Sequence, residues 1–237
     1  MQVRRNSTNE PVAFNRSLGA RNPVQFLQSA VSFSNRKFVF AIETEPRWRT
    51  SLKAHMDRVG AMSTLIAEAV GLGFRDSELI GEAARLHDVG KVFIAPAILE
   101  KPGALNDEET RTVRMHTVWG HDALRRSDNP ALELAAEVAL QHHENWDGSG
   151  YPFGLSGEEI SLAARIVSIC DVYDSLREAR PYKPALSHIR SVAIITQGDD
   201  RTRPKMFDPS ILDTFARNQT LCREIFDQLG AAKRCSA

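Results

Sequence analysis

Histidine side chains recur at regular intervals along the sequence, and imidazole is a common ligand of metal ions in proteins. Five of the seven histidines fall on or at the ends of predicted helices, at intervals of 32, 29 and 26 residues from the first to the fourth: His55, His87, His116, His142 and His143. Antiparallel helices of a bundle would each present one such side chain at the same level. We therefore predict a metal site between facing helices.

Two aspartates complete this set of candidate ligands. Asp88 follows His87 directly, and Asp171 lies in the apolar segment IVSICDV. An unpaired carboxylate on so apolar a helix would be strongly unfavourable or would become protonated, so a divalent cation is the simplest partner. Imidazole and carboxylate without thiolate suit iron, manganese, zinc, cobalt or nickel. Asp174, one turn after Asp171, is interpreted as a neighbour of the ligands or as part of a solvated face.

Apolar residues at helical spacing predict the elements that carry these side chains. They step by three and four between residues 52 and 69, which indicates a helix that begins near Pro46 and stops at Gly71. Further helices are predicted over residues 76–88, 106–116, 129–144 and 160–176, and Asn106 with Glu109 has the pattern of a capping box. The glycine- and proline-rich segment 146–154 predicts a structured loop. No segment alternates with period two, so we expect an all-α bundle.

Composition limits the classes of function. The 237 residues include 30 Lys and Arg and 30 Asp and Glu, so there is no net charge to support broad binding of duplex nucleic acid. The three cysteines lack C-x-x-C spacing, which suits a reducing compartment. No run of about 18 apolar residues predicts a membrane span, and we expect a cytoplasmic protein. The chain is divided into an N-terminal arm or small helical addition (1–45), one domain (46–230) and a tail (231–237).

The chain from about Pro46 to Phe215 resembles the HD-GYP domain, a branch of the HD phosphohydrolase superfamily that degrades cyclic di-GMP. The motifs that carry the resemblance are HDVGK at 87–91, HHENWDGSGYP at 142–152 and ARPYK at 179–183. The phrases ILEKPG at 98–103 and FDP at 207–209 also fit the family. The resemblance implies an all-α HD-domain helical bundle, with the glycine- and proline-rich GYP loop over a dinuclear metal site.

The resemblance also implies a role for each candidate residue. Asp88 would bridge two divalent ions, one of them held further by His55, His87 and Asp171, and the other by His116, His142 and His143. Iron is the favoured metal, ahead of manganese and of zinc, cobalt or nickel. Asp88 and Lys91 would be the catalytic residues, and the residues that contact substrate would be Lys91, Tyr151, Arg180 and Lys183.

The implied reaction is hydrolysis of cyclic di-GMP in second-messenger signalling, because two cations can activate water and neutralise charge on a phosphate. Members with a third metal use a glutamate four residues before the first histidine, where this chain has Ser51. We therefore expect two metal ions and linear pGpG as the main product, with GMP as a further product. The alternatives are hydrolysis of another dinucleotide such as cyclic GMP-AMP, or a weakly catalytic receptor or interaction module. A diguanylate cyclase or another regulatory protein is the expected protein partner.

Overall fold

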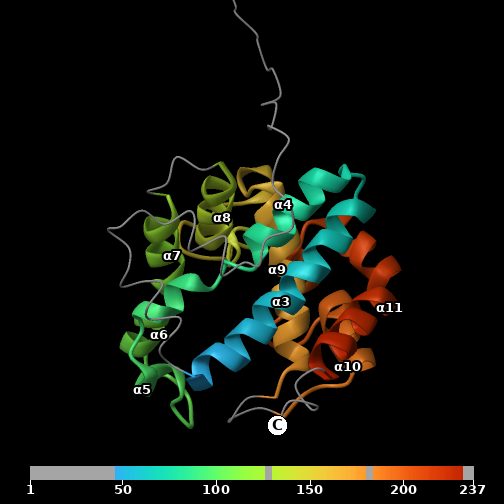
Figure 1. Ribbon diagram of the computed structural model, residues 1–237. Helices are drawn as coiled ribbons and strands as arrows, with labels where there is room; N and C mark the ends of the chain where they lie inside the picture. The colour runs from blue at the N-terminus through green and yellow to red at the C-terminus, as the bar shows by residue number, and fades with distance from the viewer. Residues whose placement is uncertain (1–45, 126–129, 180–183, 232–237) are drawn as a thin grey trace, which may run out of the picture.

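The computed structural model describes residues 46–125, 130–179 and 184–231, and within these ranges every regular element is a helix (Figure 1). This confirms the predicted all-α class. The expectations for residues 1–45, and for the tail beyond residue 231, lie outside the described residues. In chain order the elements are α3 (Pro46–Ala69), α4 (Phe74–Ala84), the 3-10 helix η2 (Val89–Phe93), α5 (Pro96–Leu99), α6 (Asp107–Arg114), α7 (His116–Leu124), α8 (Pro130–Gln141), η3 (Gly157–Glu159), α9 (Leu162–Arg177), α10 (His188–Gln197), η4 (Pro204–Met206) and α11 (Pro209–Ala231).

Helix α3 runs through the middle of the bundle, and its neighbours α4 and α9 contact α8 on the far side. It packs against α4, α9 and α11, while α7 packs against α8 and η2 on the other side (Figure 1). Its core face is formed by Val59, Met62 and Ile66, which are fully buried. The helix stops before Gly71, whose φ of 99° is a conformation that favours glycine. The predicted first helix and its end are therefore confirmed.

Helix α4 is shorter than predicted, and the reason lies in the candidate ligand His87. The prediction extended this helix to Asp88, whereas the α-helix ends at Ala84. From there the backbone bonds tighten, because Leu86 N–H donates to Ala83 O and His87 N–H donates to Ala84 O. The His87 ring also donates from Nδ1 to the carbonyl oxygen of Ala84, at 2.6 Å. The side chain therefore caps a helix end that the apolar pattern alone does not reveal.

Helix α6 begins as predicted and ends two residues early. Asn106 Oδ1 accepts from the Glu109 N–H, and the Glu109 carboxylate accepts from the Asn106 N–H, which confirms the capping box. The helix ends at Arg114, and α7 begins at His116, with Met115 shared as the cap between them. The break gives His116 the first position of a new helix rather than the last position of the old one.

Helices α8 and α9 flank the glycine- and proline-rich segment. Helix α8 ends at Gln141 rather than at residue 144, so His142 and His143 belong to the start of the loop. Helix α9 starts at Leu162, and its N-cap Ser161 accepts from the Ala164 N–H, close to the predicted bounds of 160–176. Within the described part of the chain, none of the helices combines the length and the apolar character needed to cross a membrane.

The 3-10 helix η2 lies against the start of α7, and Gly90 makes this approach possible. A Cβ atom at Gly90 would lie 1.9 Å from the carbonyl oxygen of His116 and 2.6 Å from the backbone nitrogen of Gly120. No side chain fits at that distance. The absence of a Cβ therefore allows the segment that carries Asp88 and Lys91 to contact the helix that carries His116.

Candidate metal centre

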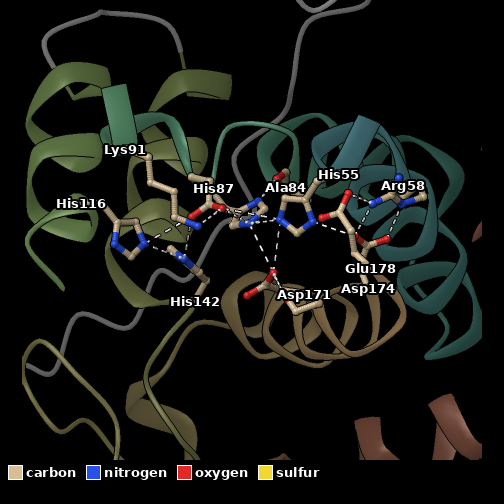
Figure 2. A network of polar contacts seen from close by, with 12 residues as sticks. His55, Arg58, Ala84, His87, Lys91, His116, His142, Asp171, Asp174 and Glu178 are labelled. Carbon is tan, nitrogen blue, oxygen red and sulfur yellow. Dashed lines mark hydrogen bonds and ion pairs between the residues drawn. The ribbon is translucent and has the colours of Figure 1, made fainter. Parts of the chain in front are cut away.

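The structure brings all seven predicted ligands to one place in the bundle, although they come from separate segments. Figure 2 labels His55, His87, His116, His142 and Asp171 among them. His55 lies in α3, and Asp171 lies in α9. The other five lie at helix ends: His87 and Asp88 between α4 and η2, His116 at the start of α7, and His142 and His143 after α8. All are buried except His143, which is half-buried.

Asp88 lies at the centre and faces a different set of histidines with each carboxylate oxygen. Its Oδ2 lies 3.5 Å from His55 Nε2 and 3.4 Å from His87 Nε2. Its Oδ1 lies 3.3 Å from His116 Nε2 and 3.8 Å from His142 Nε2. Two groups of possible ligands thus share this one carboxylate, the first with His55 and His87 and the second with His116, His142 and His143.

Asp171 contributes a second carboxylate to the first group. Its Oδ1 lies 3.3 Å from His55 Nε2 and 3.8 Å from His87 Nε2. The two Nε2 atoms are themselves 3.2 Å apart. Two nitrogen lone pairs and two carboxylate oxygens therefore converge on a small volume, which a cation would stabilise.

The orientation of the histidine rings leaves Nε2 available as a ligand atom. Nδ1 of His87 contacts the carbonyl oxygen of Ala84, and Nδ1 of His116 contacts that of Val113, both at 2.6 Å. His142 Nδ1 lies 3.0 Å from the carbonyl oxygen of Ala139. A carbonyl oxygen only accepts, so the proton of each neutral ring lies on Nδ1. The lone pair of Nε2 then points to the centre, as metal-binding histidines require.

Burial lowers the pKa of the histidines in both groups, but the two aspartates reverse this effect for His87. It lowers the pKa of His116 to about 4 and that of His143 to about 3, so both rings are neutral at neutral pH. Burial also opposes a proton on His87, but Asp88 and Asp171 outweigh it and raise that pKa to about 9. Metal binding in the first group must therefore displace a proton, whereas the second group offers free lone pairs.

The residues present fit a pair of divalent cations. Asp88 Oδ1 is buried and has no hydrogen-bond partner, and such an atom carries a desolvation cost unless another group offsets it. Nitrogen and oxygen donors without thiolate match the metals expected from the sequence. A third group of potential ligands consists of His55, Asp174 and Glu178, but the guanidinium of Arg58 already pairs with both carboxylates.

The predicted substrate residues are only partly described. Lys91 Nζ forms an ion pair with Asp88 Oδ2, and its side chain is 22% exposed, so its ammonium group lies at the boundary between the centre and solvent. The Tyr151 ring stacks on the ring of His143, with centroids 4.8 Å apart. Arg180 and Lys183 lie outside the described residues.

Arg114 is a basic residue near the centre that the sequence analysis missed. Its guanidinium lies 4.9 Å from the centroid of the Tyr151 ring, and the residue is exposed two positions before His116. In the parts of the chain that the structure describes, no carboxylate pairs with it. The signal in the sequence was a basic residue two positions before a candidate ligand, at the end of a predicted helix.

Glu144 was also missed, although it lies within the second motif. The residue is buried, and its two carboxylate oxygens accept from the N–H groups of Phe153 at 2.7 Å and Leu155 at 3.1 Å. It therefore closes the loop that carries Tyr151. Gly150 completes the turn, because a Cβ there would lie 2.3 Å from the backbone nitrogen of Asn145.

Replacing Glu144 by glutamine is expected to loosen this loop. The amide has one acceptor oxygen, so its NH2 group would face a backbone N–H donor, and the free energy of unfolding should fall by about 1–3 kcal/mol. Urea unfolding measures that change, and chymotrypsin cleavage after the exposed Phe153 reports the opening of the loop. Glu158→Gln, an exposed position in η3, is the matched control. Wild-type stability and cleavage in the Glu144 variant would contradict the role of this carboxylate.

The segment that contains all the candidate ligands is similar to known proteins. The family model described as "HD domain" matches residues 41–211. The chain is 36% identical over 219 residues to "Cyclic di-GMP phosphodiesterase response regulator RpfG" of Xanthomonas campestris pv. campestris, an alignment that covers 86% of this chain and 57% of that protein. It is 42% identical over 130 residues to "3'3'-cGAMP-specific phosphodiesterase 2" of Vibrio cholerae, which covers 55% of this chain and 25% of that protein.

A solved structure has the same fold. The protein Bd1817 of Bdellovibrio bacteriovorus, described as an HDGYP protein, superposes with a TM-score of 0.58 at 17% identity, over 83% of this chain and 60% of that one. This likeness concerns the fold alone. The alignments span 57% and 25% of the lengths of the two relatives named above.

Proposed function

Because the chain belongs to the HD domain family, we propose that it is a metal-dependent phosphodiesterase of the HD-GYP type that hydrolyses cyclic di-GMP. The observation that carries the proposal is the position of Asp88. One of its oxygens faces His55 and His87, and the other faces His116 and His142. A carboxylate shared by two sets of imidazoles is what a pair of divalent cations around one phosphate requires. The residues of this domain are taken as 46–230.

The proposed ligands of the first ion are His55, His87, Asp88 and Asp171, and those of the second are Asp88, His116, His142 and His143. Iron is the favoured metal. When bound, the two ions would supply Lewis-acid stabilisation of phosphate charge and a lower pKa for water. The protein's contribution is to hold the seven side chains close together, with the tautomers of His55, His87, His116 and His142 already set by Nδ1 contacts.

Three described side chains are proposed to hold the dianionic substrate. Lys91 pairs with Asp88, and with that carboxylate committed to metal its ammonium group would be available to a phosphate oxygen. Arg114 lies on the face of Tyr151, where a guanidinium can donate two parallel hydrogen bonds to phosphate or to a guanine edge. Tyr151 in turn is fixed on His143. Arg180 and Lys183 remain proposed contacts on the basis of the ARPYK motif.

The proposed main product is the linear dinucleotide pGpG. Water adds to one phosphorus, the bond to the ribose 3′-oxygen breaks, and the products of that step are a 5′-phosphate and a 3′-hydroxyl on the same opened chain. A third metal is not expected to take part. Ser51 stands where a glutamate would be needed, and in the group of His55, Asp174 and Glu178 the two carboxylates already bind the guanidinium of Arg58.

The test is hydrolysis of a panel of dinucleotides by protein prepared without oxygen and loaded with iron or manganese. Cyclic di-GMP, 3′3′-cyclic GMP-AMP and cyclic di-AMP are each supplied, and the products are separated by chromatography. We expect cyclic di-GMP to give pGpG fastest. Faster turnover of 3′3′-cyclic GMP-AMP would make that dinucleotide the preferred substrate. A protein with two bound metals that cleaves none of the three dinucleotides would overturn the proposed activity.

Replacing Arg114 by alanine is expected to weaken substrate binding rather than metal binding. Loss of a hydrogen-bonding cation costs about 1.5–3 kcal/mol, which corresponds to about a 10- to 100-fold higher KM for cyclic di-GMP. The metal content should not change, since Arg114 contacts no proposed ligand atom. Steady-state kinetics and elemental analysis of the same preparation measure both quantities.

Arg111→Ala is the matched control, because Arg111 is an exposed arginine one turn earlier in α6. Its KM should equal that of the wild type within about twofold. Equal KM values for the Arg114 and Arg111 variants would remove Arg114 from the proposed substrate site.

A further inference from the structure

A buried ion pair joins α3 to α9 one turn away from the metal centre. Arg58 follows His55 by three residues and is 3% exposed. Its Nε donates to Asp174 Oδ1 at 2.6 Å, and one terminal nitrogen donates to Asp174 Oδ2 at 2.8 Å and to Glu178 Oε1 at 3.1 Å (Figure 2). Asp174 is fully buried. Two parallel bonds fix the plane of its carboxylate.

The same carboxylate also contacts a proposed metal ligand. Asp174 Oδ2 lies 2.7 Å from His55 Nδ1, and a carboxylate paired with arginine accepts, so the histidine proton lies on Nδ1. His55 Nε2 then faces the centre, 3.3 Å from Asp171 Oδ1. His87 and His116 take their orientation from backbone carbonyls three residues earlier in the chain. His55 differs, because a side chain from another helix orients it.

Helix α11 closes this network from the other side. The Phe226 ring lies 4.8 Å from the guanidinium carbon of Arg58 and 4.4 Å from that of Arg177. Arg177 in turn donates to Asp227 at 2.9 Å. The aromatic face attracts both cations and restricts where the Arg58 side chain can lie. The contacts thus run without a gap from α11 through Arg58 and Asp174 to His55.

We propose that Asp174 and Arg58 are positioning residues for His55. Through the contact of Phe226 with Arg58, the metal group of His55, His87, Asp88 and Asp171 then depends on the packing of α11 against α3. The second group, with His116, His142 and His143, does not share these contacts. Removing the network therefore weakens one metal site and spares the other. The inference rests on the metal-binding part of the proposed function and needs no knowledge of the substrate.

The test is a zinc titration of metal-free protein, with elemental analysis and calorimetry to count and rank the sites. Wild-type protein should bind two ions per chain. Asp174→Asn should bind one of them about 10- to 100-fold more weakly, the range for loss of a residue that orients a ligand, and should bind the other as wild type does. Phe226→Leu should weaken the same site by a smaller factor.

Asp208→Asn is the matched control, because Asp208 is a buried carboxylate that accepts from Arg165 at 2.6 Å, and its described hydrogen bonds and ion pairs involve no histidine. Loss of a buried ion pair alone would affect both aspartate variants equally, whereas the proposal predicts two intact sites in this control. If Asp174→Asn binds zinc at each site with the same affinity as the wild type, the positioning role is overturned. Wild-type affinities in Phe226→Leu would overturn the link to α11.

A second measurement does not depend on the stability of any variant. The nitrogen chemical shifts of His55 in the zinc-loaded wild type report its tautomer, and the proposal requires the proton on Nδ1. A proton on Nε2 would overturn it. Wild-type protein that binds no metal would instead contradict the proposed function, so the two failures are distinguishable.

Discussion

Asp88→Asn is expected to abolish hydrolysis of cyclic di-GMP while the helices remain folded. The asparagine side chain has one carbonyl oxygen and an NH2 group, so it cannot offer an anionic oxygen to both histidine groups. Several kcal/mol of stabilisation of the phosphate charge depend on the ions, which corresponds to a loss of turnover of about a thousandfold or more. Turnover, metal content and the far-ultraviolet circular dichroism of the same preparation measure the effect.

Asp213→Asn is a suitable control for this change. Asp213 is an exposed residue of α11 that pairs with Arg217 four residues later, at 2.6 Å. Exposed pairs of this kind contribute little to stability, so turnover and metal content should match those of the wild type. Retained turnover in Asp88→Asn, or two metal ions bound with wild-type affinity, would refute the shared carboxylate as the basis of the centre.

Gly90→Ala is expected to have the second largest effect, although this residue contacts no ligand atom itself. The added Cβ would lie 1.9 Å from the His116 carbonyl oxygen, and backbone atoms cannot move aside as a flexible side chain can. η2 and α7 must then separate, which should cost about 3 kcal/mol of unfolding free energy. Because Asp88 and Lys91 flank this contact, metal affinity should fall as well. Urea unfolding and zinc titration measure the two effects.

Gly103→Ala separates this effect from the general consequence of replacing glycine. No heavy atom lies within 4 Å of a Cβ at Gly103, and its backbone is not in the left-handed region. We expect its stability to stay within about 1 kcal/mol of the wild type. If the Gly90 and Gly103 variants unfold at the same urea concentration, the close approach of η2 and α7 does not require glycine at position 90.

The seven candidate ligands predicted from the sequence lie together in the structure, whereas the boundaries of several helices were predicted less well. Helical spacing correctly indicated α3 and α9, whose ends carry local signals, at Gly71 and Ser161. It extended α4 and α8 too far. In α4 the His87 ring donates a hydrogen bond to the Ala84 carbonyl oxygen where the helix ends. This contact depends on the rotamer of the ring, which the spacing of apolar residues does not predict.

The residues that orient the ligands could not be recognised from single-residue context. Asp174 was interpreted as either a neighbour of the ligands or a solvated residue, and Arg58 looks in sequence like any charge on an amphipathic helix. Their role becomes visible only from the contacts between α3 and α9. Arg58 and Asp174, for example, are 116 positions apart in the chain. Arg114 was missed for a related reason, since its position over Tyr151 depends on how the loop folds back.

The dispersal of the ligands over α3, α7, α9 and the ends of α4 and α8 has a thermodynamic consequence. In the proposed two-metal centre, a partly unfolded chain that has lost any one of these helices would lack ligands for at least one ion, so metal would bind the complete fold in preference to partly unfolded states. By linkage, free metal at a hundredfold excess over its dissociation constant adds about 2.7 kcal/mol per site to the free energy of unfolding. A shortage of metal would therefore raise the population of unfolded chain, and with it the susceptibility of the protein to proteolysis.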